Sequence, residues 1–196
     1  MSDRNVAHYT LDAWVRDLET VADAAGLAHF TLLGMSQGAA IAIEYAVRHP
    51  QRVERLVIHG GYVRGVLRRG LGDRQREEFE ATTKLIELGW GRDNPAFRQL
   101  FTSMFVPGGT AEEVDSFNRL QQVSARAEEV ARMVCGYAGI DVQAQAAKVR
   151  CPTLLMHAHD ARAPFDEGRL VASLIPGARF VPLESRNHVM LAHEPA

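Results

Sequence analysis

The chain has 196 residues, of which 46% are apolar and 23% charged, a balance typical of one soluble domain that buries most of its surface. Lysine plus arginine number 22 and aspartate plus glutamate 24, so a net charge of -2 gives no electrostatic basis for binding nucleic acid or an anionic membrane. No apolar run approaches the roughly 20 residues of a membrane span, and the charged N-terminal segment is no secretory signal. Two cysteines are too few for a disulfide framework and predict a cytoplasmic location.

Apolar positions spaced three and four residues apart predict helices over residues 11–25 and 37–48. Short apolar runs bounded by turn residues predict four strands, at residues 30–34, 53–59, 153–158 and 179–183. Strands that alternate with helices form parallel sheets joined by right-handed crossovers. The predicted fold class is therefore α/β, a mostly parallel sheet with flanking helices in a single domain over residues 1–196.

A long insertion between the second and third predicted strands, about residues 62–149, has helical patterns and no strand signal, and it predicts a helical cap. Apolar and aromatic residues cluster within 97–105, either as packing between cap helices or as a wall over a pocket. Several arginines at the start of the insertion are interleaved with acidic residues, which favours a solvated helical face over an anion site. They are Arg64, Arg68, Arg69, Arg74 and Arg76.

A G-x-S-x-G motif, Gly34-Met35-Ser36-Gln37-Gly38, directly follows the first predicted strand. At a strand-to-helix turn, such a serine is held in a strained conformation that projects its hydroxyl above the sheet, while the flanking glycines let strand and helix approach closely. The backbone N–H of Gln37, at the start of the next helix, is placed to face a developing oxyanion. Ser36 is therefore the candidate nucleophile.

A serine nucleophile needs a histidine that accepts its proton and an acid that orients this histidine. In this architecture they follow in the order serine, acid, histidine, on loops after later strands. Asp160 lies just past the predicted strand at 153–158, and His188 lies five residues past the strand at 179–183. The order predicts a triad of Ser36, Asp160 and His188; the alternative is that Asp160 caps a turn and His188 caps a helix.

Three further residues near the serine turn are possible pocket residues: Met35, His59 and Tyr62. His59 precedes a glycine pair at the end of a predicted strand, close to the turn. A purely structural role is an equal alternative for His59 and for Tyr62.

The histidines also raise the possibility of a metal site, because His157, His159 and Asp160 lie together and His188 and His193 follow later. Imidazole and carboxylate ligands suit zinc. The His-x-His-Asp spacing, however, matches no established metallohydrolase pattern, and a metal would leave the serine motif unexplained. We therefore expect no metal and no organic cofactor.

Four stretches of the chain resemble the α/β-hydrolase family: residues 34–38, 49–58, 151–155 and 187–188. The resemblance covers nearly the whole chain and implies a partial α/β-hydrolase fold with a helical cap and a serine-type triad. The serine at position 36 argues against the dehalogenases and epoxide hydrolases of this fold, which have aspartate there. Residues 11–19 and 175–183 look more narrowly like the hydrolase-like domains of bacterial signalling and regulatory proteins.

The chain departs from the family pattern in three places. The segment from His157 to Asp160 is one residue shorter than the family's His-Gly-x-x-Asp loop. Residues 2–4 resemble the loop after the family's fourth strand, so we expect a fold truncated at its N-terminus, without the loop that supplies a second oxyanion N–H. A closing helix is also expected beyond Ala196.

Together, these features predict a serine hydrolase that acts on a small uncharged ester, thioester or amide. The alternative is a weak or inactive hydrolase fold that serves as a ligand-binding or assembly module in signalling. Without preceding strands, the strand at 30–34 becomes an apolar sheet edge, which predicts a homodimer or larger assembly. The expected partners are a small-molecule substrate and a second copy of the chain, with no nucleic acid or membrane.

Overall fold

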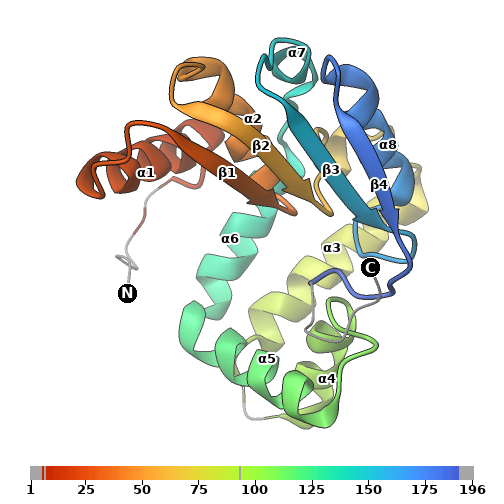
Figure 1. Cartoon of the computed structure of the whole chain (residues 1–196). Helices are drawn as coiled ribbons and strands as arrows, with labels where there is room; N and C mark the ends of the chain where they lie inside the picture. Colours follow the sequence, from red (N-terminus) through yellow and green to blue (C-terminus); the bar gives the residue numbers. More distant parts are fainter. Residues whose placement is uncertain (1–5, 7, 93, 190–196) are drawn as a thin grey trace.

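The computed structural model describes residues 6, 8–92 and 94–189. Its strands form one parallel sheet in the order β1-β2-β3-β4: β1 (Phe30–Met35), β2 (Val53–His59), β3 (Thr153–Ala158) and β4 (Arg179–Leu183). The α/β fold class and the four strands predicted from the sequence are confirmed. β1 pairs with β2 alone, so it forms one edge of the sheet (Figure 1).

Four helices share a hydrophobic core with the sheet: α1 (Leu11–Ala24), α2 (Gly38–Arg48), α7 (Gln143–Ala146) and α8 (Phe165–Leu174). Thr10 begins α1 as its N-cap, because its side-chain oxygen accepts a hydrogen bond from the N–H of Ala13 at 3.2 Å. The buried face of α1, which includes Val15, packs against α2.

The core lies on one face of the sheet. Leu32 and Leu56 are paired across β1 and β2, and both are buried against residues of α2 such as Ile43. The alternate residues of β1 point the other way, and there Leu33 and Met35 are 54% and 40% exposed. Parallel sheets ordinarily have both faces covered, so this apolar outer face is an unusual feature of the described part of the chain.

A helical cap connects β2 to β3, and the carboxyl ends of the strands point towards it (Figure 1). Its elements are η1 (Val66–Arg68), α3 (Asp73–Gly89), α4 (Pro95–Ser103), α5 (Ala111–Ser124) and α6 (Ala127–Ala138). Thr110 and Glu113 form a capping box that begins α5. Within the described residues, no helix is long and apolar enough to cross a membrane. The cap lies over the carboxyl ends of the strands, where the loops that follow them converge.

Candidate active site

Ser36 occupies a sharp turn between β1 and α2. Its φ of 53° is the only positive value at a non-glycine position in the described residues. Two backbone hydrogen bonds hold this conformation: the N–H of Ser36 donates to the carbonyl of His59 at 3.0 Å, and the carbonyl of Ser36 accepts from the N–H of Ala39 at 3.0 Å. Such a residue costs on the order of 1–3 kcal/mol and marks functional sites more often than ordinary turns.

The two motif glycines play different roles. A Cβ on Gly34 would lie 2.8 Å from the carbonyl oxygen of Gly38 and 2.9 Å from the Cα of Ala39, so only glycine lets β1 and α2 approach this closely. A Cβ on Gly38 would meet nothing within 4 Å. The expectation that both glycines serve close packing is therefore corrected at Gly38, because its Cβ would project into open space.

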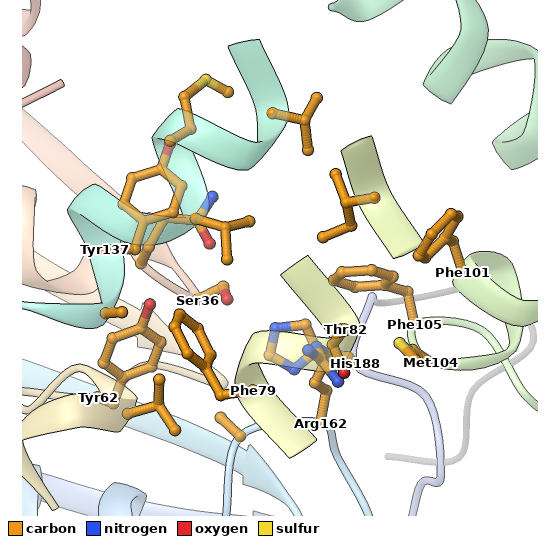
Figure 2. A pocket seen from close by; sticks show the side chains of 18 of the residues that line it. Ser36, Tyr62, Phe79, Thr82, Phe101, Met104, Phe105, Tyr137, Arg162 and His188 are labelled. Atoms are coloured by element: carbon orange, nitrogen blue, oxygen red, sulfur yellow. The ribbon is translucent and has the colours of Figure 1, made fainter. Parts of the chain in front are cut away.

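A cavity of about 520 Å³ lies between the carboxyl end of the sheet and the cap. Ser36 and His188 both line it and project into it (Figure 2). Most of its wall is apolar or aromatic, with residues from β-strand loops and from cap helices α3 to α6. The wall includes Tyr62, Phe79, Trp90, Phe101, Phe105 and Tyr137. The size and the apolar wall are typical of a small-molecule site.

His188 comes from the loop after β4 and is 2% exposed. Its backbone N–H donates to the carbonyl of Phe105 in the cap at 2.8 Å, and the two rings lie 5.9 Å apart. Neither ring nitrogen makes a hydrogen bond to a described residue, Ser36 included. The pKa of His188 is lowered from 6.5 to about 4, chiefly by burial, and the neighbouring His59, among other groups, contributes to this shift. The imidazole is therefore neutral at pH 7, the form that can accept a proton.

Asp160 does not reach the cavity. It lies in an exposed turn after β3 and makes no hydrogen bond or ion pair with any residue that the structure describes. The turn is organised by other contacts: His157 Nε2 lies 3.0 Å from the carbonyl of Ala163, and the His159 ring stacks on Phe165 at 4.1 Å. The structure thus brings Ser36 and His188 to one cavity and leaves Asp160 outside it.

Gln37 lines the cavity at the N-terminus of α2. Its backbone N–H makes no backbone hydrogen bond with the described chain, so it is free to donate into the site. Burial raises the pKa of the Tyr137 hydroxyl, and a hydrogen bond with the Gln37 side chain acts in the opposite direction. Residues 2–4, which resemble the loop after the family's fourth strand, lie outside the described residues.

The three possible pocket residues take different positions. Tyr62 lines the cavity, and burial raises its pKa to about 12, so its hydroxyl remains protonated. His59 is buried at the end of β2, and Met35 is exposed on the outer face of β1. Neither His59 nor Met35 lines the cavity.

The cap supplies much of the wall. The aromatic cluster within 97–105 was noted in the sequence, and Phe101 and Phe105 indeed line the cavity. Tyr137 and two arginines, Arg69 and Arg162, were not anticipated as wall residues. The sequence holds one signal for these wall residues: Arg162 lies two residues after the candidate catalytic acid Asp160, which predicts a place near the site.

The histidines considered as metal ligands do not form a metal-binding cluster within the described residues. No group of three or more histidine, cysteine, aspartate or glutamate side chains in the described ranges is arranged to hold a metal ion. His193 falls outside those ranges.

Comparison with known proteins places these features in a family context. Residues 2–195 match the model of a family described as alpha/beta hydrolase fold. The protein RutD of Klebsiella pneumoniae, whose carbamate hydrolase assignment is provisional, is 25% identical in an alignment of length 191 that covers 93% of this chain and 67% of RutD. Pyrrolizixenacetamide deacetylase of Xenorhabdus hominickii is 29% identical in an alignment of length 182 that covers 88% of this chain and 62% of that protein.

Solved structures show the same fold. An esterase from Exiguobacterium antarcticum matches with a TM-score of 0.77 at 22% identity, covering 93% of this chain and 68% of the esterase. An enol-lactonase from Burkholderia xenovorans matches with a TM-score of 0.70 at 22% identity, covering 90% of this chain and 65% of the lactonase. The chain therefore spans about two thirds of the length of the proteins it resembles.

Proposed function

Because the chain belongs to the alpha/beta hydrolase fold family, we propose that it is a serine hydrolase that cleaves a small ester, thioester or amide. The observation that carries this proposal is that Ser36, on its strained turn, and a neutral, buried His188 line the same apolar cavity. Relatives named as a deacetylase and an esterase support hydrolysis of acyl compounds.

The proposed chemistry has two halves. Ser36 Oγ attacks the acyl carbon while His188 accepts the hydroxyl proton, and the tetrahedral oxyanion receives a hydrogen bond from the N–H of Gln37. The bond to the leaving group breaks as His188 returns the proton to it, which leaves an acyl-serine. A water molecule, deprotonated by His188, then attacks the acyl-serine and releases the acid and Ser36.

Asp160 is proposed to orient His188 and to stabilise its imidazolium form during turnover. This role requires the turn after β3 to move, because Asp160 is exposed and His188 has no hydrogen-bond partner in the described structure. The same observation favours the second candidate function, a catalytically weak hydrolase fold that binds a ligand. The narrower likeness to domains of bacterial signalling proteins is in keeping with this alternative.

Ser36→Ala tests the nucleophile. We expect hydrolysis of p-nitrophenyl butyrate to fall at least about 10³-fold and covalent labelling by a fluorophosphonate to disappear, since the reagent needs an activated serine. Ser173→Ala, at an exposed serine of α8 that bonds only to its own helix, should leave both unchanged. Turnover retained in Ser36→Ala would assign the chemistry to another group.

Asp160→Asn separates the two candidate functions. If Asp160 orients the base, kcat should fall at least about 100-fold with no loss of stability, because the side chain is exposed. Asp166→Asn, at an exposed carboxylate of α8 near the same turn, is the matched control and should leave kcat unchanged. A wild-type protein that neither hydrolyses esters nor reacts with the fluorophosphonate would be the ligand-binding module.

A further inference from the structure

Two guanidinium groups line the cavity, from Arg69 and Arg162, and none of the described aspartates and glutamates lines it. Arg69 immediately follows η1 at the base of the cap, and Arg162 lies on the loop after β3. Two cations thus face an otherwise apolar wall that contains the candidate nucleophile.

Arg69 is well buried, and most of its hydrogen-bonding capacity is unused. Its side chain is 16% exposed. The Nε–H donates to the carbonyl of Arg64 at 2.9 Å, while the two terminal nitrogens make no hydrogen bond to any described residue. Burial lowers the pKa of Arg69, which expresses the cost of a poorly solvated cation. An arginine has five N–H donors, so four remain to be satisfied.

Among the described residues, Glu167 is the one carboxylate within ion-pair distance of Arg69, and Arg69 shares it with Arg64. Glu167 accepts a hydrogen bond from Arg64 at 2.6 Å, whereas its Oε1 is 3.9 Å from Arg69 Nε. Arg162 has no carboxylate of the described chain within ion-pair distance; its guanidinium lies over the ring of Phe105 at 5.7 Å. The three arginines Arg64, Arg69 and Arg162 together with Glu167 therefore carry a net charge of about +2.

An unpaired arginine on a protein surface is unremarkable in itself. Some other arginines of this chain have acidic partners, such as Arg48 with Asp12 and Arg126 with Glu129, and exposed ones such as Arg55 and Arg119 have no ion pair with a described residue. Arg162 remains accessible at the cavity, yet surrounding protein atoms desolvate its guanidinium and lower its pKa. It lies close to His188 in the site (Figure 2). A cation partly stripped of water and left without a counterion is a favourable partner for an anionic ligand.

We propose that the cavity selects a substrate whose acyl part carries a carboxylate, bound by Arg162 and Arg69, with the scissile carbonyl at Ser36. This proposal rests on the proposed function, and it replaces the uncharged substrate expected from the sequence with an anionic one. The planar guanidinium suits a carboxylate because it can donate two parallel hydrogen bonds. The aromatic wall takes up the apolar carbons between the carboxylate and the scissile bond.

A pair of esters that differ in one charge tests the substrate class. The p-nitrophenyl monoester of glutarate carries a free carboxylate, and its methyl-capped diester is neutral but otherwise matched. For the wild type we expect kcat/KM at least tenfold higher for the monoester, falling with added salt because the attraction is electrostatic. The p-nitrophenyl monoesters of succinate, glutarate and adipate differ in chain length, so comparing their kcat/KM values shows which separation of carboxylate and scissile carbonyl the cavity prefers.

Arginine variants identify the anion site. Arg162→Gln and Arg69→Gln should each lower the ratio of the two kcat/KM values at least about tenfold, the size of a charge-assisted hydrogen bond. Arg74→Gln, at a 91% exposed arginine on the outer surface of α3, should keep the wild-type ratio. Equal losses for both esters in Arg162→Gln, or no preference in the wild type, would overturn the proposal.

Binding without catalysis separates this proposal from the proposed function. Ser36→Ala protein should bind 4-phenylbutyrate at least tenfold more tightly than 4-phenylbutanamide in calorimetry, and Arg162→Gln in the same background should abolish the difference. Trp90 in the wall provides a second, fluorescence readout of occupancy. If the Ser36→Ala protein binds the carboxylate tightly but the wild type hydrolyses no ester, the proposed hydrolase function is refuted and the anion site is not. Equal binding of acid and amide would refute the anion site alone.

Discussion

The backbone N–H of His188 donates to the carbonyl oxygen of Phe105 across 2.8 Å, so a loop of the cap holds the loop that carries the candidate base. A second bond reinforces this link: the N–H of Gly108 donates to Oδ1 of Asn187 at 2.8 Å. Asn187 is itself 6% exposed. The two bonds join the cap loop to the loop that carries His188, so we expect a displacement of the cap to change the position of the base.

Asn187→Ala should weaken this coupling. Loss of the amide leaves the N–H of Gly108 without its acceptor, which costs about 1–3 kcal/mol of stability. Because His188 is then less well positioned, we expect kcat to fall about tenfold, with a smaller change in KM. Steady-state kinetics and urea unfolding measure both effects. Ser173→Ala is the control, and a normal kcat in a destabilised Asn187→Ala protein would show that the bond serves stability alone.

The depressed pKa of His188 predicts how stability depends on pH. In the unfolded chain its pKa is near 6.5, and in the folded protein burial lowers it to about 4. Between these values the unfolded state binds a proton that the folded state excludes, so stability is fully present above pH 6.5 and is lost as the pH falls towards 4. The shift corresponds to about 3 kcal/mol over that window.

Urea unfolding of wild type and His188→Asn between pH 4 and pH 7 measures this contribution. The free energy of unfolding should rise more steeply with pH in the wild type, and the two curves should run parallel above pH 7. Subtracting the variant removes the contribution of His157, whose pKa burial also lowers. Parallel curves throughout the range would mean that the pKa of His188 is the same in the folded and unfolded states, as for a solvated imidazole.

The two glycines of the serine motif should respond oppositely to alanine. In Gly34→Ala the new methyl group would press on the backbone of α2 at less than 3 Å, so we expect a loss of about 1–3 kcal/mol. Gly38→Ala has open space around its Cβ at the first residue of α2, and alanine favours the helix by up to about 1 kcal/mol. Thermal unfolding of the wild type and the two variants measures these changes in stability. A stable Gly34→Ala protein would contradict the close packing of β1 against α2.

The sequence predicts the sheet well because its strands carry local signals. Phe30–Met35 is a short apolar run, and the glycine-serine turn that follows it restricts the backbone to one conformation. The order serine, acid, histidine also places residues at the correct edge of a parallel sheet. Local rules therefore account for Ser36 and for the entry of His188 into the same cavity.

Side-chain partners across the cavity are less predictable, because they depend on packing between segments far apart in the chain. Asp160 and His188 are both at strand ends, yet the exposed turn of Asp160 does not bring the pair into contact. The acidic residues near Arg69 in the sequence predict that it lies on a solvent-exposed helical face. In the described part of the fold, the acidic residue nearest to it is Glu167, almost a hundred residues later, and this carboxylate accepts its hydrogen bond from Arg64.

We propose that the uncovered edge and outer face of β1 bind a second copy of the chain. Leu33 and Met35 are 54% and 40% exposed there, and β1 contains neither lysine nor proline to discourage pairing. Outside its contacts with β2, the strand has backbone donors and acceptors on its open side. A second β1 related by a two-fold axis matches them as an antiparallel neighbour, because such an interface is self-complementary.

Leu33→Lys tests this assembly. The side chain is exposed in the single chain, so the variant should fold, but lysine at the edge should block the apolar contact. We expect sedimentation to give a dimer for the wild type at micromolar concentration and a monomer for Leu33→Lys. Val123→Lys introduces the same charge at a 57% exposed position of α5, far from β1 in sequence, and should remain dimeric. A monomeric wild type with rapid hydrogen exchange along β1 would show that the edge faces water.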